Sequence, residues 1–199
     1  MPEVLFIDAC PRGAESRTLR LAGAFLEALR AGQPEARVKP LCLNDLSLLP
    51  LDGTSLAMRE ALIAAGETEH SLFEPARLFR NADLIVVAAP YWDYMFPASL
   101  KTLIEHLCVR TVTFDYVNDR PVGYCRAEKL VYITTAGGYI GDNDWGYRYM
   151  SAVCGELLGI SSFERISCEG LDIAGNDPEA LLEEAGVRAR ALASGIIIA

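Results

Sequence analysis

A continuous apolar run at residues 84–89 constrains the fold of this chain more than any other feature. Polar and apolar side chains do not alternate in it, so both faces of the strand that it forms must be covered. Pro97 then precedes a stretch in which Leu100, Leu103 and Leu107 share one helical face. A buried strand followed by an amphipathic helix is the repeating unit of a parallel sheet with helices on both faces.

The same alternation extends over the whole chain. Strands are predicted at residues 3–8, 37–43, 84–89, 129–135 and 162–168. Helices are predicted after each strand, with a break near Gly66 or Pro75 in the second helical stretch, a fourth helix at 147–159 and a last one after Asp177. Pro40 places the second strand at an edge of the sheet. We therefore predict one α/β domain over residues 1–199, with a five-stranded parallel sheet in the order 2-1-3-4-5.

Residues 109–126 fit neither pattern, and we expect them to form an irregular excursion. They contain the run Val112-Thr113-Phe114-Asp115-Tyr116. No internal repeat, low-complexity tract or linker interrupts the chain.

Composition excludes several classes of protein. The net charge of −9 disfavours a nucleic-acid partner, which requires a basic surface. No apolar run has the length of a membrane span. The six cysteines include no Cys-x-x-Cys pair, which predicts reduced thiols in the cytoplasm. With two histidines a His-built metal site is disfavoured, and the absence of a Gly-x-Ser-x-Gly elbow disfavours a serine hydrolase.

The loop after the first strand is a candidate phosphate site. Ser16 and Thr18 place hydroxyl groups at the start of a helix, where backbone N–H groups are free and the helix dipole is positive. Arg12 or Arg17 supplies further positive charge. Alternatively, Ser16 is only the N-cap that any helix needs. Cys10 lies near the same helix start, a setting that can lower the pKa of a thiol and make it a nucleophile.

The loop after the third strand carries four aromatic residues, Tyr91, Trp92, Tyr94 and Phe96. In open α/β sheets ligands bind at the carboxyl ends of the strands. We therefore expect this loop to hold a flat aromatic cofactor between ring faces and backbone N–H groups. The alternative is a small hydrophobic cluster beneath a loop.

The loop after the fourth strand begins with Gly137 and Gly138, which let backbone approach a ligand closely. An ordinary strand-to-loop turn explains this pair equally well. Tyr139 and Trp145 follow and are candidates for covering the site. Because the first, third and fourth strands are neighbours in the predicted order, their three loops should meet at one crevice.

These segments together resemble the flavodoxin-like family of FMN-dependent NAD(P)H:quinone oxidoreductases and azoreductases. The resemblance runs nearly from end to end, and three segments carry it best: Pro90-Tyr91-Trp92-Asp93-Tyr94 with the following Pro97-Ala98-Ser99, Val112-Thr113-Phe114-Asp115-Tyr116, and Thr135-Ala136-Gly137-Gly138. It implies that FMN carries the chemistry, that NAD(P)H is the donor and that no side chain acts as a catalytic group or metal ligand. It also implies a quinone, azo or nitroaromatic acceptor.

The resemblance assigns residues to parts of the FMN. It places the phosphate at Cys10, Ser16, Arg17 and Thr18, and the ring system between Pro90, Tyr91, Trp92, Asp93, Tyr94 and Thr135, Ala136, Gly137, Gly138. The acceptor pocket is expected at Phe114, Tyr139 and Trp145, with homodimers that carry the Phe114 region across the interface. Cys10 stands where the family commonly has serine, and Asp93 where it commonly has asparagine.

Two other functions fit the same sequence. A flavodoxin-type carrier would bind FMN and exchange electrons with protein partners, which suits the acidic charge. A redox-sensing module would use Cys10 as its switch. The aromatic residues around the crevice favour a substrate pocket and hence the enzyme.

Overall fold

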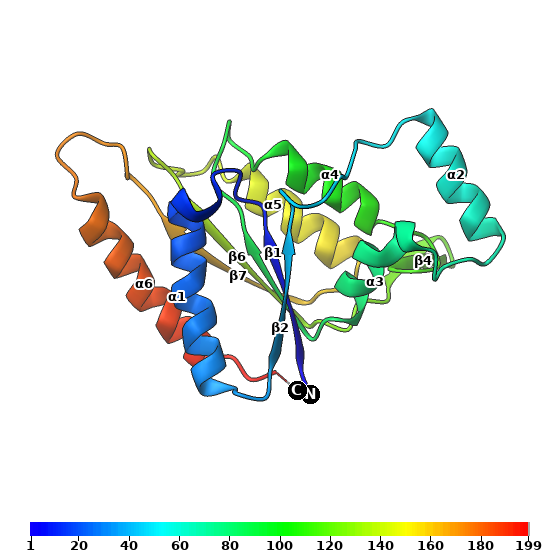
Figure 1. The fold of residues 1–199 in the computed structure, drawn as a ribbon, viewed down its shortest axis with the longest axis horizontal. Helices are drawn as coiled ribbons and strands as arrows, with labels where there is room; N and C mark the ends of the chain where they lie inside the picture. The colour runs from blue at the N-terminus through cyan, green and yellow to red at the C-terminus, as the bar shows by residue number, and fades with distance from the viewer. Residues whose placement is uncertain (199) are drawn as a thin grey trace.

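The computed structural model describes residues 1–198, with a five-stranded parallel sheet at its centre (Figure 1). The strands are β1 (Glu3–Asp8), β2 (Arg37–Cys42), β3 (Leu84–Ala88), β6 (Lys129–Thr135) and β7 (Ser162–Cys168). They lie in the order β2-β1-β3-β6-β7, and every neighbouring pair is parallel. Counted along the chain, this is the predicted order 2-1-3-4-5, with the Pro40 strand at an edge as expected.

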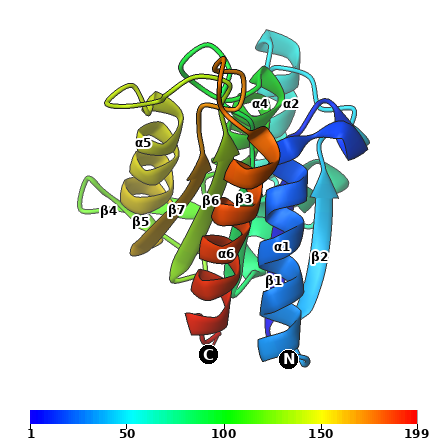
Figure 2. The same cartoon turned by 90° about the vertical axis from the view of Figure 1, so that its left-hand side faces the viewer.

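Helices cover both faces of the sheet. Figure 2 shows α1 (Arg17–Gly32) and α6 (Pro178–Gly195) side by side on one face. The other face carries α3 (Glu74–Asn81), α4 (Ala98–Leu107) and α5 (Trp145–Ala152). Between β2 and α3, α2 (Gly53–Ala64) buries none of its residues and lies away from the sheet (Figure 1). The predicted break in this region falls at Gly66, whose φ is 74°.

The apolar run predicted a strand covered on both faces, and β3 is such a strand. Its residues are almost completely inaccessible to solvent, and their side chains alternate between two separate cores. Ile85 and Val87 pack with α4, whereas Leu84 and Val86 pack with α1 and α6. Burying each of these side chains contributes roughly 1.5–3 kcal/mol to folding. The fold therefore depends on this strand being apolar on both faces.

The expectation of an irregular excursion at 109–126 is wrong for part of that segment. There β4 (Phe114–Val117) and β5 (Arg120–Gly123) form an antiparallel hairpin. The turn residues Asn118 and Asp119 have φ values of 51° and 61°, as a type I′ turn requires. Asn and Asp tolerate this left-handed conformation better than most residues. At its other end the hairpin is tightly packed, because a Cβ on Gly123 would lie 2.0 Å from the Leu158 carbonyl carbon.

The fourth predicted helix begins earlier than expected. Asp144 caps α5 by accepting a hydrogen bond from the Tyr147 N–H at 3.2 Å, so Trp145 is already helical. Past Ala152 the helix continues as a π-helical turn at Val153–Leu157. None of the helices in the described residues combines the length and the hydrophobicity that crossing a bilayer requires.

Candidate functional site

The loops after β1, β3 and β6 meet at the carboxyl edge of the sheet and line one cleft of about 200 Å³, here called the central cleft. The predicted convergence of the three loops is confirmed. The lining residues are Pro11, Arg12, Ser16, Arg17, Thr18, Pro90, Tyr91, Trp92, Thr135, Gly137 and Asp172. A cavity of similar volume, about 230 Å³, lies at the amino ends of β1 and β2, where none of these loops reaches.

The start of α1 offers free hydrogen-bond donors to the central cleft. Ser16 is the N-cap: its hydroxyl accepts from the Leu19 N–H at 3.2 Å, and its carbonyl accepts from the Arg20 N–H at 3.0 Å. The N–H groups of Arg17 and Thr18 have no acceptor within residues 1–198. Two free N–H groups at a helix N-terminus form a site for an anion. Ser16 thus caps the helix and also lines the cleft.

Thr18 faces the protein and not the cleft opening. Its side chain is fully buried, and its hydroxyl oxygen lies 2.6 Å from that of Thr135. This bond joins the first turn of α1 to the end of β6. The Thr18 hydroxyl is therefore already paired, and only the backbone N–H of this residue remains for a ligand.

Arg17 is also paired within the chain. Its guanidinium donates to both carboxylate oxygens of Asp172, at 2.9 and 3.3 Å, and to the carbonyl of Leu171 at 3.3 Å. This guanidinium holds the pKa of Asp172 below its ordinary value. Arg12 lines the same cleft and forms no ion pair within the described chain. Arg12 is therefore the cation that remains available for an anionic ligand.

Asp172 is the charged cleft residue that the sequence prediction missed. It belongs to the loop after β7, the fifth strand, whose carboxyl end lies at the same edge of the sheet. The signal that could have found it is its position, since polar residues just after any parallel strand are candidates for this edge.

Cys10 does not have the properties of a reactive thiol. It is 1% exposed, and its thiol donates to the Ala88 carbonyl at 3.5 Å inside the core. Burial raises the pKa of the thiol to about 12. The lowered pKa expected from the nearby helix is therefore wrong, because desolvation by burial outweighs the hydrogen bond with Ser16. The thiol is also not among the groups that line the central cleft.

The aromatic loop is a tight turn and not a loose cluster. The N–H and carbonyl groups of Trp92 and Met95 form reciprocal hydrogen bonds at 2.7 and 3.0 Å. Between them Asp93 and Tyr94 have φ values of 49° and 66°. Pro90, Tyr91 and Trp92 line the cleft, whereas Asp93 and Tyr94 are exposed at the tip of the turn.

Phe96 is the one member of the loop that belongs to the core, at 5% exposure. The alternative of a buried cluster therefore describes this residue only. Trp92 is 44% exposed, so its indole offers a free surface beside the cleft. The loop is anchored to β6 by the Tyr91 N–H, which donates to the Thr135 carbonyl at 3.0 Å.

The two glycines after β6 play different roles. A Cβ on Gly137 would lie 2.2 Å from the Oδ2 atom of Asp172, whereas a Cβ on Gly138 would meet nothing within 4 Å. Neither glycine has a positive φ. A side chain at position 137 would thus have to displace the Asp172 carboxylate, whereas Gly138 faces open space. Ala136 is buried, and its N–H donates to the Cys168 carbonyl.

The predicted acceptor-pocket residues do not line the central cleft. Phe114 is buried in the core, with its ring centroid 5.7 Å from that of Tyr116, so its ring is not available to a ligand within this chain. Tyr139 and Trp145 are 71% and 52% exposed, and neither is among the residues that line the cleft. His106 is buried, with its Nε2 atom 2.9 Å from the Leu49 carbonyl oxygen.

Comparison with known proteins places this geometry in context. Residues 2–192 match a family model described as a flavodoxin-like fold. The chain is 33% identical over 189 residues to FMN-dependent NADH:quinone oxidoreductase 2 of Clostridium acetobutylicum, covering 92% of this chain and 93% of the relative. It is 31% identical over 196 residues to an FMN-dependent NADH:quinone oxidoreductase of Clostridium perfringens, covering 97% and 98%.

Solved structures resemble the fold closely. A Bacillus anthracis azoreductase superimposes with a TM-score of 0.87 at 22% identity, covering 98% of this chain and all of the other. An FMN-dependent NADH-azoreductase from the same species, solved in complex with FMN, gives a TM-score of 0.85 at 21% identity, covering 98% of each chain.

Proposed function

The chain belongs to the family with the flavodoxin-like fold that includes the FMN-dependent NADH:quinone oxidoreductases, and on this premise we propose that it oxidises NAD(P)H through FMN and reduces quinone, azo or nitroaromatic acceptors. One observation carries the proposal. Three loops line the same cleft: the predicted phosphate-binding loop after β1, the aromatic loop after β3 and the loop after β6 that begins with two glycines.

The residues of the central cleft fit FMN. The free N–H groups of Arg17 and Thr18, with the unpaired Arg12, suit a phosphate group. The pairing of Arg17 with Asp172 offsets the one carboxylate in the cleft lining. The exposed face of Trp92, which lines the cleft, suits a planar ring.

Bound FMN would supply hydride chemistry, which no side chain of the twenty amino acids provides. The protein's own contribution is binding, orientation and electrostatics. Within the described residues, the N–H groups of Asp93, Tyr94, Gly137 and Gly138 donate no hydrogen bond, so they are free to meet the polar edge of the ring system. Such preorganised donors stabilise negative charge where it develops.

The sensor alternative has lost its basis, because the Cys10 thiol is buried with a raised pKa. The carrier alternative predicts no turnover of small acceptors. The curated relatives are named as quinone oxidoreductases, which supports the enzyme.

The test is the visible absorption of the purified protein before and after anaerobic addition of NADH or NADPH. We expect flavin absorption that bleaches with the nicotinamide and returns when a soluble quinone is added. A protein that takes up no FMN would overturn the proposal. If the flavin absorption bleaches only when a separate reductase protein is added, and NAD(P)H is not oxidised directly, the electron-carrier alternative would be favoured.

We further propose that the chain forms one domain and works in the cytoplasm. We also propose that it forms a homodimer through the β4–β5 hairpin. Support comes from the apolar side chains that the hairpin exposes, Tyr116, Val117 and Val122. Sedimentation equilibrium should give twice the chain mass for the wild type and a lower mass for Tyr116→Lys. A monomeric wild type at micromolar concentration would contradict the dimer.

A further inference from the structure

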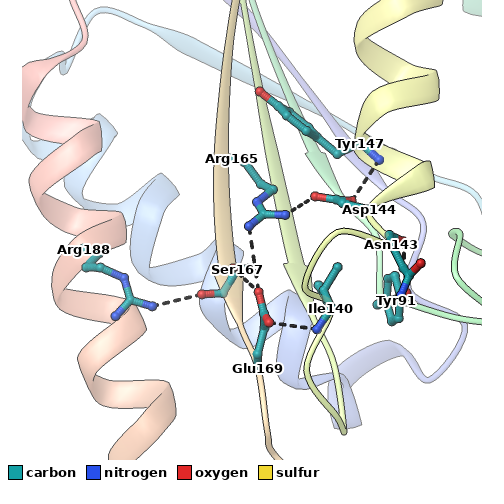
Figure 3. Close-up of polar contacts among 9 residues, drawn as sticks. All are labelled: Tyr91, Ile140, Asn143, Asp144, Tyr147, Arg165, Ser167, Glu169 and Arg188. Carbon is teal, nitrogen blue, oxygen red and sulfur yellow. Dashed lines mark hydrogen bonds and ion pairs between the residues drawn. The ribbon is translucent and has the colours of Figure 1, made fainter.

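Residues 139–144, which lie between β6 and α5, support the aromatic turn from outside the central cleft; we call them the bracing segment (Figure 3). The Tyr91 hydroxyl donates to the Asn143 carbonyl at 3.1 Å. Just beyond the segment, Gly146 packs so closely that a Cβ would lie 3.1 Å from the Phe96 ring and 3.3 Å from the Met95 backbone. Tyr91 itself lines the cleft. The bracing segment therefore contacts the side chain of Tyr91, which forms part of one wall of the cleft.

Two carboxylates hold this segment at its ends. The Glu169 carboxylate accepts from the Ile140 N–H at 2.9 Å and from the Ser167 hydroxyl at 2.9 Å. At the other end the Asp144 carboxylate caps α5. Each carboxylate thus fixes backbone at one end of the segment that meets Tyr91.

Arg165 on β7 joins the two carboxylates. One guanidinium nitrogen donates to Oδ2 of Asp144, and another lies 3.9 Å from Oε1 of Glu169 (Figure 3). The Asp144 side chain is only 8% exposed, and Arg165 is its one cationic partner in the described chain. A buried carboxylate that loses its cation is strongly destabilised, so without Arg165 the segment would have to move toward water.

We propose that Arg165 is a positioning residue for the cofactor site: it locks the bracing segment through Asp144 and Glu169, and the segment orients Tyr91 through the Asn143 carbonyl. Arg165 itself does not line the central cleft. The inference rests on the proposed function, because the wall that it positions is the one assigned to FMN.

The test compares FMN dissociation constants of stripped protein, measured by quenching of flavin fluorescence. Arg165→Met should weaken FMN binding about tenfold, within the range for groups coupled through shared contacts. Arg165→Lys keeps the charge and should recover most of the affinity. Arg188→Met is the matched control: Arg188 donates to the Ser167 carbonyl from α6, on the other side of β7, and does not touch the bracing segment (Figure 3). Its affinity should equal that of the wild type.

A double-mutant cycle separates positioning from general stability. If Arg165 acts through Tyr91, then Tyr91→Phe should weaken binding, and adding Arg165→Met to it should have less effect than in the wild type. Additive losses, or an Arg165→Met affinity equal to that of the wild type or of Arg188→Met, would overturn the role of Arg165. Should Arg165→Met not fold, the same cycle with Arg165→Gln, which also removes the cation, decides alone. A wild type that binds no FMN would instead overturn the proposed function.

Discussion

The hydroxyl oxygens of Thr18 and Thr135 lie 2.6 Å apart in a position closed to solvent, and they join the first turn of α1 to the last residue of β6. The two residues are 117 positions apart in the sequence, yet both belong to segments assigned to one ligand. The bond therefore holds the donor end of α1 in a fixed position beside the end of β6.

Thr18→Val should destabilise the protein by about 1–3 kcal/mol, because the Thr135 hydroxyl is left without a partner. Replacing both threonines by valine should cost less than the sum of the single changes, since no unpaired hydroxyl remains. Urea denaturation monitored by circular dichroism measures both. Strict additivity of the two changes would contradict the pairing.

The two glycines after β6 should respond differently to alanine. Gly137→Ala places a methyl group against the Asp172 carboxylate and should cost about 1–3 kcal/mol, as overpacking does. Gly138→Ala, the matched control, should change stability by less than about 0.5 kcal/mol. Adding Asp172→Ala should relieve part of the Gly137→Ala loss. Equal effects of the two alanines in urea denaturation would contradict the packing described.

Acid should weaken the Arg17–Asp172 pair. Because Arg17 lowers the pKa of Asp172 in the folded state, the pair stabilises the fold above the ordinary value of 3.8, and this contribution is lost as pH falls through the lower folded value. Arg17→Gln should therefore flatten the dependence of the urea midpoint on pH between about 5 and 2. Arg20→Gln removes the ion pair with Glu179 outside the cleft. It should lower the urea midpoint but leave the FMN affinity unchanged. Parallel curves for Arg17→Gln and wild type would contradict this account.

Cys10 should resist alkylation in the folded protein. Its pKa of about 12 leaves almost no thiolate at pH 8, and its side chain is buried. Iodoacetamide followed by peptide mass spectrometry should show Cys10 modified in urea and unmodified under native conditions. Rapid native labelling of Cys10 would revive the redox-sensing alternative.

Strand order, helix placement and the convergence of the loops could be predicted, because they follow from hydrophobic periodicity and from the rules of parallel sheets. The apolar run that begins at Leu84 predicts a strand covered on both faces, and Pro40 predicts an edge strand. Both predictions depend only on nearby residues. The pairing state of each polar group could not be predicted in this way. Arg17, Thr18 and Cys10 carry suitable chemistry for a phosphate loop, but tertiary contacts occupy two of them and bury the third.

The site residues that the sequence analysis missed are those whose role depends on contacts with residues far away in the sequence. Asp172 and Arg165 lie more than a hundred residues beyond the phosphate loop, and no local pattern marks either one. The hairpin was missed for a different reason. Its turn residues, Asn118 and Asp119, are a readable signal that a search for buried strands passes over.

The interlocking of Gly123 with Leu158 has a consequence for assembly. A hairpin fixed at its base loses little mobility when another surface docks on its tip, so a second copy would find Tyr116 and Val117 already in place. In the proposed dimer, the association rate constant should then be high. It should also depend only weakly on temperature, because the hairpin does not have to become ordered first. Any side chain added at Gly123 would release that base and slow the encounter without altering the docking residues themselves.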